Sequence, residues 1–221
     1  MTFTDQQYFH IYSRGNNRRR IFFSEANYRF FLWRMRGYLL PFGNLVAYAL
    51  MTNHFHWLFY VHAQEIDRRT FYAPCDAVEN ARRRAKCGDG YIPVGPRSTR
   101  QLQSTITLNR TIGTFLGAYA QVINKQQNWT GSLFRSGCKA KGELAVAQRL
   151  YLTPHSHKDI SVLSSRYVSN CLRYIHANPT KAGLVAGDTD YRFSSAADYA
   201  GPRNGTLCNL DRGRLLLGQN T

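Results

Sequence analysis

Two histidines one residue apart, His54 and His56, are the side chains of this sequence best suited to chemistry. They lie in an aromatic and aliphatic run at 52–61, a composition that favours a β-strand. Because side chains alternate across a strand, both imidazoles should project from the same face. Imidazole is the commonest protein metal ligand, so the pair predicts a metal site. The alternative is that one or both are ordinary core histidines.

A metal site needs more than two ligands, and the best source of a third is a predicted helix at 167–179. Tyr174 and Asn178 are four residues apart, so they should lie one above the other on this helix. An amide oxygen can complete a metal site, and a phenol beside it can reach whatever the metal holds. We expect Pro179 to end the helix. Both polar residues flank an apolar stripe of Val168, Cys171, Leu172 and Ile175.

Other histidines and another tyrosine are alternatives to the candidates named above. His155 and His157 form a second pair with Asp159 nearby, but they follow a proline in a polar stretch that we interpret as a loop without a metal. Tyr119 is the alternative to Tyr174 as a reactive phenol. It falls within the apolar stripe of another predicted helix, however, so we interpret it as a core residue. His176 is a candidate general base that we expect to point elsewhere on its helix.

The composition favours a polyanionic partner. Lys and Arg number 29 against 13 Asp and Glu, a net charge of +16, and basic side chains gain affinity by releasing counterions from phosphates. An anionic membrane surface is an alternative, but no apolar run approaches the ~20 residues of a membrane span. The N-terminus lacks a signal-peptide core, so we expect a cytoplasmic protein. The five cysteines are scattered, and we expect reduced thiols.

Several short segments carry a resemblance to a known family. They are YFHIYSRGNNR at 8–18, MTNHFH at 51–56, GSLFR at 131–135 and YIHANPTKAGLV at 174–185, followed by FSS at 193–195. Together they resemble the single-tyrosine HUH transposases of the IS200-like type, which include the REP-associated tyrosine transposases. The His-x-His alone is a weak signal, but the ordered combination over most of the chain is specific.

The resemblance implies an α+β fold, a ferredoxin-like antiparallel sheet covered by helices, with loop insertions. This is the HUH endonuclease fold, in which the sheet bears the histidine pair. The order of predicted strands and helices agrees with it, including a helix expected at 104–125. We expect one catalytic domain at 1–201, with a basic insertion or long loop at about 62–101 and a second at about 144–163. Residues 202–221 are expected to be a C-terminal tail.

The resemblance also implies a reaction and its partners. Tyr174 would attack single-stranded or hairpin DNA and stay joined to the 5′ end, while His54, His56 and Asn178 would hold a divalent metal. The family implies Mg²⁺ or Mn²⁺, whereas two imidazoles alone favour Mn²⁺ or Zn²⁺. Relatives occur as monomers and dimers, so a homodimer stays open.

Basic residues near these segments are expected to contact DNA phosphates, although a charge run is often only a solvated surface. Gly137 and Cys138 depart from the commoner Gly-Arg pair of the family, which puts one phosphate contact in doubt. The expected DNA-binding residues are Arg14, Arg18, Arg19, Arg135, Lys139, Lys141 and Lys181.

Other functions compete with this interpretation. A structure-specific DNA-binding protein derived from a transposase would keep the basic surface without catalysis. A carboxylate-based two-metal nuclease would need several acidic residues near the core, but the acidic residues lie in polar stretches. A membrane-surface protein would need a basic amphipathic helix, whereas the helical stripes here are typical of a core.

Overall fold

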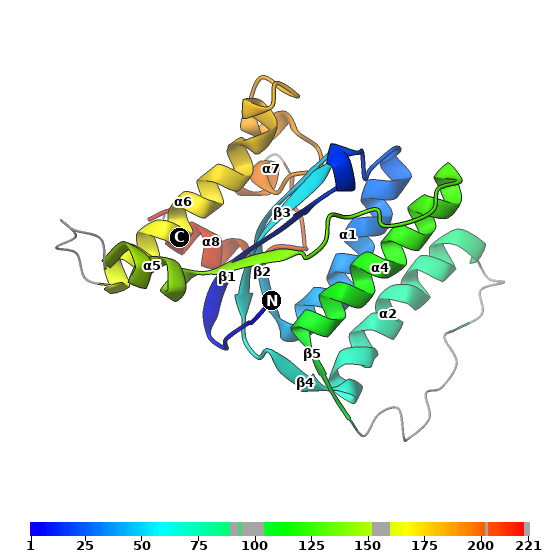
Figure 1. Cartoon of the computed structure of the whole chain (residues 1–221), viewed down its shortest axis with the longest axis horizontal. Helices are drawn as coiled ribbons and strands as arrows, with labels where there is room; N and C mark the ends of the chain where they lie inside the picture. The colour runs from blue at the N-terminus through cyan, green and yellow to red at the C-terminus, as the bar shows by residue number, and fades with distance from the viewer. Residues whose placement is uncertain (89–92, 94–103, 152–159, 202, 219–221) are drawn as a thin grey trace.

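A four-stranded antiparallel sheet forms the centre of the molecule (Figure 1), seen in a computed structural model that describes residues 1–88, 93, 104–151, 160–201 and 203–218. The strands lie in the order β2-β3-β1-β6. The chain runs from β1 through a helix to the β2–β3 hairpin and then, among the described residues, through two further α-helices to β6, which is a ferredoxin-like arrangement with one additional helix. The predicted α+β class is confirmed. The strand bounds are β1 Gln7–Arg14, β2 Gly43–Met51, β3 His54–Val61 and β6 Lys139–Gly142.

Strand alternation gives the sheet two different faces. Phe55, Trp57 and Phe59 of β3 are fully buried in the larger core. The intervening residues, His54 and His56 among them, point to the opposite face, as the sequence predicts. On the neighbouring strand Arg14 pairs with His54, and Tyr12 pairs with His56.

Helices α1 (Glu25–Leu39) and α4 (Leu108–Gln127) cover the aromatic face (Figure 1). Helix α1 follows Ser24, which is its N-cap residue. The expected start of α4 at Ser104 is wrong, because 105–107 pair as strand β5 (Thr105–Thr107) with β4 (Glu65–Asp67). Thr107 instead caps α4, since its hydroxyl accepts the backbone N–H of Arg110 at 3.3 Å.

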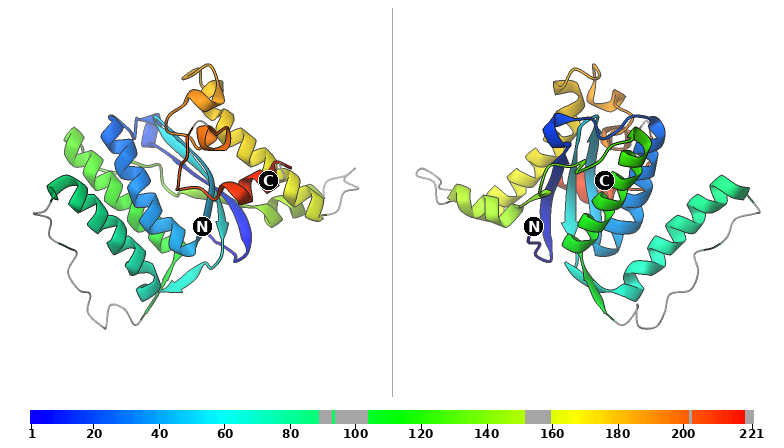
Figure 2. Two further views of the ribbon diagram at one scale, coloured as in Figure 1. Left: turned by 180° about the vertical axis from the view of Figure 1, so that it is seen from behind. Right: turned by 45° about the vertical axis from the view of Figure 1, so that its right-hand side comes forward.

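The segment at 62–101, expected as an insertion or long loop, contains helix α2 (Arg68–Cys87). Its N-cap is Asp67, whose carboxylate accepts the N–H groups of Arg69 at 2.8 Å and Thr70 at 3.1 Å. Both views of Figure 2 place α2 outside α1, away from the sheet. Phe71 is its buried residue. This helix therefore widens the layer behind the aromatic core.

The opposite face is covered by helices from the second half of the chain. The predicted stripe of α6 packs on small side chains of β2 and on Leu58 of β3. Leu216 and Leu217 pack against the same cluster, so the residues expected as a C-terminal tail fold back onto the sheet. The helices of this half of the chain are α5 Glu143–Tyr151, α6 Ile160–Lys181, α7 Ala196–Tyr199 and α8 Leu210–Leu216. Short 3-10 turns in the described chain are η1 Asn16–Arg18, η2 Leu40–Phe42 and η4 Asp188–Asp190.

Pro179 does not end its helix, contrary to expectation, because α6 continues to Lys181. A proline in the last turn removes one N–H and leaves the following residues free to stay helical. The helix ends where Gly183 adopts a left-handed conformation with φ of 67°. There the N–H of Leu184 donates to the Pro179 carbonyl at 3.0 Å, as in a Schellman cap.

The described helices include none that is long and apolar enough to cross a membrane. All five cysteines are free thiols, in agreement with the sequence. Packing of helices on both faces of the sheet, without a disulfide, holds this part of the chain together.

Candidate active site

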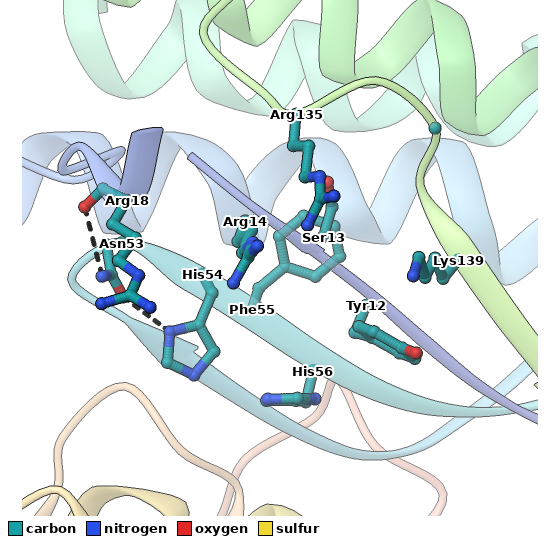
Figure 3. Close-up of a pocket in the computed structure, with 11 residues that line it drawn as sticks. Tyr12, Ser13, Arg14, Arg18, Asn53, His54, Phe55, His56, Arg135 and Lys139 are labelled. Carbon is teal, nitrogen blue, oxygen red and sulfur yellow. Dashed lines mark hydrogen bonds between the residues drawn. The ribbon is translucent and has the colours of Figure 1, made fainter. Parts of the chain in front are cut away.

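The two histidines of β3 line an open cleft of about 490 Å³ at one end of the central strands (Figure 3). His54 lies at the start of the strand and His56 one step further in. Arg14 and Tyr12 of β1 lie beside them, as the strand register requires. Nitrogen donors, guanidinium groups and a phenol therefore share one cavity.

Asn53 fixes the orientation of the His54 ring (Figure 3). Its Nδ2 donates to the Arg18 carbonyl at 3.3 Å, so its Oδ1 is the atom 2.6 Å from His54 Nδ1. An amide oxygen only accepts, which means that His54 Nδ1 carries the hydrogen. The Nε2 lone pair of neutral His54 is then left for a ligand, an arrangement typical of metal-binding histidines.

His56 is more deeply buried, at 7% exposed, and its Nδ1 lies 2.9 Å from His10 Nε2. Burial lowers the pKa of His56 to about 3 and that of His10 to about 4, and it lowers the pKa of His54 as well. The three rings are therefore uncharged near pH 7. A neutral imidazole is the form that binds metal.

Tyr174 reaches the histidines from α6. Its ring centre lies 5.5 Å from that of His56 and 6.0 Å from that of His10. The packing of Ile175 and Leu172 against the sheet holds α6 in this position. Tyr174 is nevertheless 43% exposed, so a ligand in solution can approach its ring. The structure thus brings the predicted nucleophile beside His56, one of the predicted metal ligands, and both roles stay predictions.

The Asn178 side chain hydrogen-bonds to its own helix. Its Nδ2 donates to the backbone carbonyl of Tyr174 at 2.8 Å, and it is absent from the cleft lining. Within the described ranges, no three His, Cys, Asp or Glu side chains are grouped to hold a metal. The donor set of His54 and His56 fits a divalent ion in part, and a ligand role for Asn178 stays a prediction.

Most of the predicted DNA-binding residues gather around the site. Arg14, Arg18, Arg135 and Lys139 line the cleft. Nearby are two lysines that the cleft lining does not include, with Lys141 Nζ 5.9 Å from the Tyr12 ring and Lys181 Nζ 5.7 Å from the Tyr174 ring. Arg19 is the exception, because its guanidinium stacks on Trp129 at 4.9 Å and does not line the cleft.

The segment before β6 is fixed to β1 by backbone and side-chain contacts. The N–H of Arg135 donates to the Arg14 carbonyl at 2.9 Å. Cys138, where an arginine is commoner in the family that the sequence resembles, turns its thiol toward the Tyr12 carbonyl at 3.4 Å. Position 138 is thus used for packing, while Arg135 and Lys139 supply the positive charge.

The rival candidates for these roles lie elsewhere. Tyr119 is fully buried in the aromatic core, where its hydroxyl donates to the Ile21 carbonyl at 2.7 Å and burial raises its pKa. It is a core residue, as its place in the apolar stripe predicts. His155 and His157, together with Asp159, lie outside the described residues.

His176 points away from the Tyr174 ring. Its Nε2 lies 2.9 Å from Ser195 Oγ, and its ring contacts that of Tyr199. Burial lowers its pKa to about 4. It is a buried structural histidine, as its place on the helix predicts.

His10 is the site residue that the sequence reasoning missed. It lies in the first quoted segment, and alternation along β1 puts it on the same face as Tyr12 and Arg14. What the sequence does not show is that β1 pairs with β3, which brings His10 to His56. Long-range strand pairing was the missing information.

Comparisons with known proteins give only weak support for a family. No family model matches the chain, and no curated protein matches it. A solved structure of a REP-associated tyrosine transposase bound to a REP hairpin is 10% identical, covering 90% of this chain and 82% of that one, with a TM-score of 0.47. At these values the likeness is too weak to assign a family, so the residues of the site have to carry any assignment of function.

Proposed function

We propose that this protein is a metal-dependent tyrosine transposase or endonuclease that cuts and rejoins single-stranded DNA. One observation carries the proposal: the exposed ring of Tyr174 lies against His56 and His10, next to the cleft lined by cationic side chains. A phenol, neutral imidazoles and guanidinium groups are together suited to phosphodiester chemistry. The +16 charge of the chain supports a nucleic-acid partner.

Tyr174 would act as the nucleophile. Its oxygen would bond to the scissile phosphorus as the bond to the 3′ oxygen breaks, and the phenolic proton would end on the released 3′ hydroxyl. The 5′ end would remain on the protein as a phosphotyrosine ester. Because that ester replaces the broken one, a 3′ hydroxyl can attack it and rejoin strands without an energy source.

The histidines would supply the metal ligands. His54 and His56 would hold Mg²⁺ or Mn²⁺ through Nε2, with Asn178 as a further ligand. Such an ion would polarise the phosphate and offset its negative charge. The imidazole donors favour Mn²⁺ over Mg²⁺, since Mg²⁺ prefers oxygen ligands.

The cationic side chains would bind the DNA backbone. Arg14, Arg135 and Lys139 line one cavity, and guanidinium groups and ammonium groups are the usual partners of phosphate oxygens. Contacts on both sides of the scissile bond would orient the strand for attack. They carry no information about base sequence, so the proposal extends to single-stranded or hairpin DNA as a class.

A denaturing gel tests the nucleophile. End-labelled single-stranded hairpin DNA is incubated with the protein and Mn²⁺, and a denaturant-resistant adduct is expected for the wild type. Tyr174→Phe should form none. Tyr12→Phe is the matched control, because Tyr12 is the other phenol in contact with His56 and should be dispensable. An adduct with Tyr174→Phe that disappears with Tyr12→Phe would transfer the role to Tyr12.

The second candidate is a DNA-binding protein without catalysis. The contact between Asn178 and the helix backbone, instead of the histidines, favours it. Tight binding of hairpin DNA, with no adduct on any hairpin tested with Mn²⁺ or Mg²⁺, would replace the transposase proposal with this one.

A further inference from the structure

His10 and His56 form a buried pair whose purpose the proposed reaction does not explain. Their Nε2 and Nδ1 atoms lie 2.9 Å apart, and the rings stack with centres 5.1 Å apart. His10 is 8% exposed and His56 is 7% exposed. They come from adjacent strands, β1 and β3, and contact each other diagonally on one face of the sheet.

The pair has two possible hydrogen-bonding arrangements. Burial favours the neutral form of both rings, so one nitrogen donates the shared hydrogen and the other accepts it. If His56 donates from Nδ1, its Nε2 has a free lone pair and can bind a metal. If His10 donates from Nε2, the hydrogen of His56 is on Nε2, and that atom cannot be a ligand.

His10 itself is poorly placed to be the missing metal ligand. Its Nε2 is engaged by His56, and it is absent from the lining of the cleft, whereas His54 and His56 are both present. The contact resembles that of Asn53 with His54, in which the Nδ1 atom of a candidate ligand meets an acceptor. The difference is that an amide oxygen only accepts, while a histidine nitrogen can do either.

We propose that His10 is a positioning residue that accepts the Nδ1–H of His56 and so keeps the Nε2 of His56 open for a divalent metal. The proposal rests on the proposed metal role of His56. Burial makes the contact matter, because solvent has little access to replace the acceptor. Loss of such an outer contact typically lowers metal affinity about 10–100-fold.

Direct measurement of Mn²⁺ binding to the DNA-free protein tests this without activity. Free Mn²⁺ is followed by electron paramagnetic resonance for the wild type, His10→Phe and His10→Gln. Phenylalanine keeps a ring but has no acceptor, so the Mn²⁺ affinity of His10→Phe should fall about 10–100-fold. Glutamine offers an amide oxygen to the Nδ1–H of His56, so the Mn²⁺ affinity of His10→Gln should stay within a few-fold of the wild type. Thermal unfolding confirms that each variant is folded.

A long-range ¹H–¹⁵N spectrum of the histidine side chains gives an independent readout. The wild type should show His56 with hydrogen on Nδ1, and His10→Phe should shift the hydrogen toward Nε2. Wild-type Mn²⁺ affinity in folded His10→Phe, an equal loss in His10→Gln, or hydrogen on Nε2 of wild-type His56 would each overturn the proposal. So would a wild type that binds no Mn²⁺.

The two proposals can fail separately. If the wild type forms the Tyr174 adduct while His10→Phe binds Mn²⁺ normally, the positioning role alone is wrong. If Mn²⁺ binding depends on His10 but no adduct forms on any hairpin, the positioning role stands and the transposase proposal is wrong.

Discussion

The two faces of the central sheet differ in what their side chains do, although the same strand supplies both. On one face Phe55, Trp57 and Phe59 are fully buried under α1 and α4. On the other face His54 and His56 border an open cleft, and α6 covers the remainder with a smaller apolar cluster. The difference shows how a polar site can be held rigidly by strand residues whose alternate side chains are fixed in a core.

The face that carries His54 and His56 can form a binding site because helices cover only part of it. A fully covered sheet would bury its polar groups at a cost and exclude any large ligand. Here α6 packs through Val168, Leu172 and Ile175, while Tyr174 of the same helix remains partly exposed beside the histidines. Substitutions on the two faces should therefore have different effects, on stability for one face and on activity for the other.

His56→Ala should have the largest effect, and the effect should be on activity. If His56 holds the metal, as proposed, its loss costs several kcal/mol of transition-state stabilisation, and the rate of adduct formation should fall on the order of 10³-fold. DNA affinity, measured by fluorescence anisotropy, should change much less because the cationic residues remain. Equal losses in adduct formation and in DNA binding would contradict a chiefly catalytic role for His56.

Trp57→Ala, one residue along on the opposite face, should act on stability. Its ring is fully buried against Phe31, Phe55 and Phe115, and truncating such a side chain costs about 3–5 kcal/mol. Urea denaturation measures the change in the free energy of unfolding. Where the variant is still folded, adduct formation per folded molecule should be close to wild type. A comparable loss of activity in the folded fraction would show that the two faces are not separable.

Acidification should destabilise the protein through its buried histidines. For His176 the folded pKa is about 4 against an ordinary value of 6.5, so below 6.5 the unfolded chain takes up a proton that the folded chain does not. The contribution of neutral His176 to stability is complete above pH 6.5 and is lost as the pH falls toward 4. This contribution amounts to about 3 kcal/mol at most.

Urea titrations between pH 7.5 and 4.5 test this dependence. His176→Gln should lose part of the slope of unfolding free energy against pH, whereas Trp57→Ala should lower stability and keep the slope. An unchanged slope in His176→Gln would show that its protonation is not linked to folding.

Arg135→Ala should have the smallest effect, confined to DNA binding. Its side chain lines the cleft without an acidic partner in the described structure. The free energy of unfolding should therefore change by less than about 0.5 kcal/mol. DNA affinity should fall about tenfold, and the slope of log affinity against log salt should drop by about one. Arg19→Ala, whose cation stacks on Trp129 outside the cleft lining, is the matched comparison and should leave that slope unchanged. Equal slopes in both variants would mean that Arg135 does not contact phosphate.

Local patterns were enough to predict much of this protein. Alternation placed His54 and His56 on one face of a strand, and the apolar stripe of α6 identified its buried side. The same reasoning separated buried Tyr119 from Tyr174. These predictions held because periodicity is a property of a few neighbouring residues. The errors arose where a partner decides the local structure, as at Thr105–Thr107, which becomes a strand by pairing with β4.

By itself the sequence determined which residues are chemically suited to the proposed reaction and which side of its own element each one occupies. The tertiary structure alone decided that α6 lies over β3, that Tyr174 meets His56, and that His10 from the first strand completes the histidine cluster. It also left Asn178 bonded to its own helix and Arg19 against Trp129. The physical reason is that periodicity orients a side chain about its own axis, whereas contacts between distant segments depend on strand pairing and on packing summed over the whole chain.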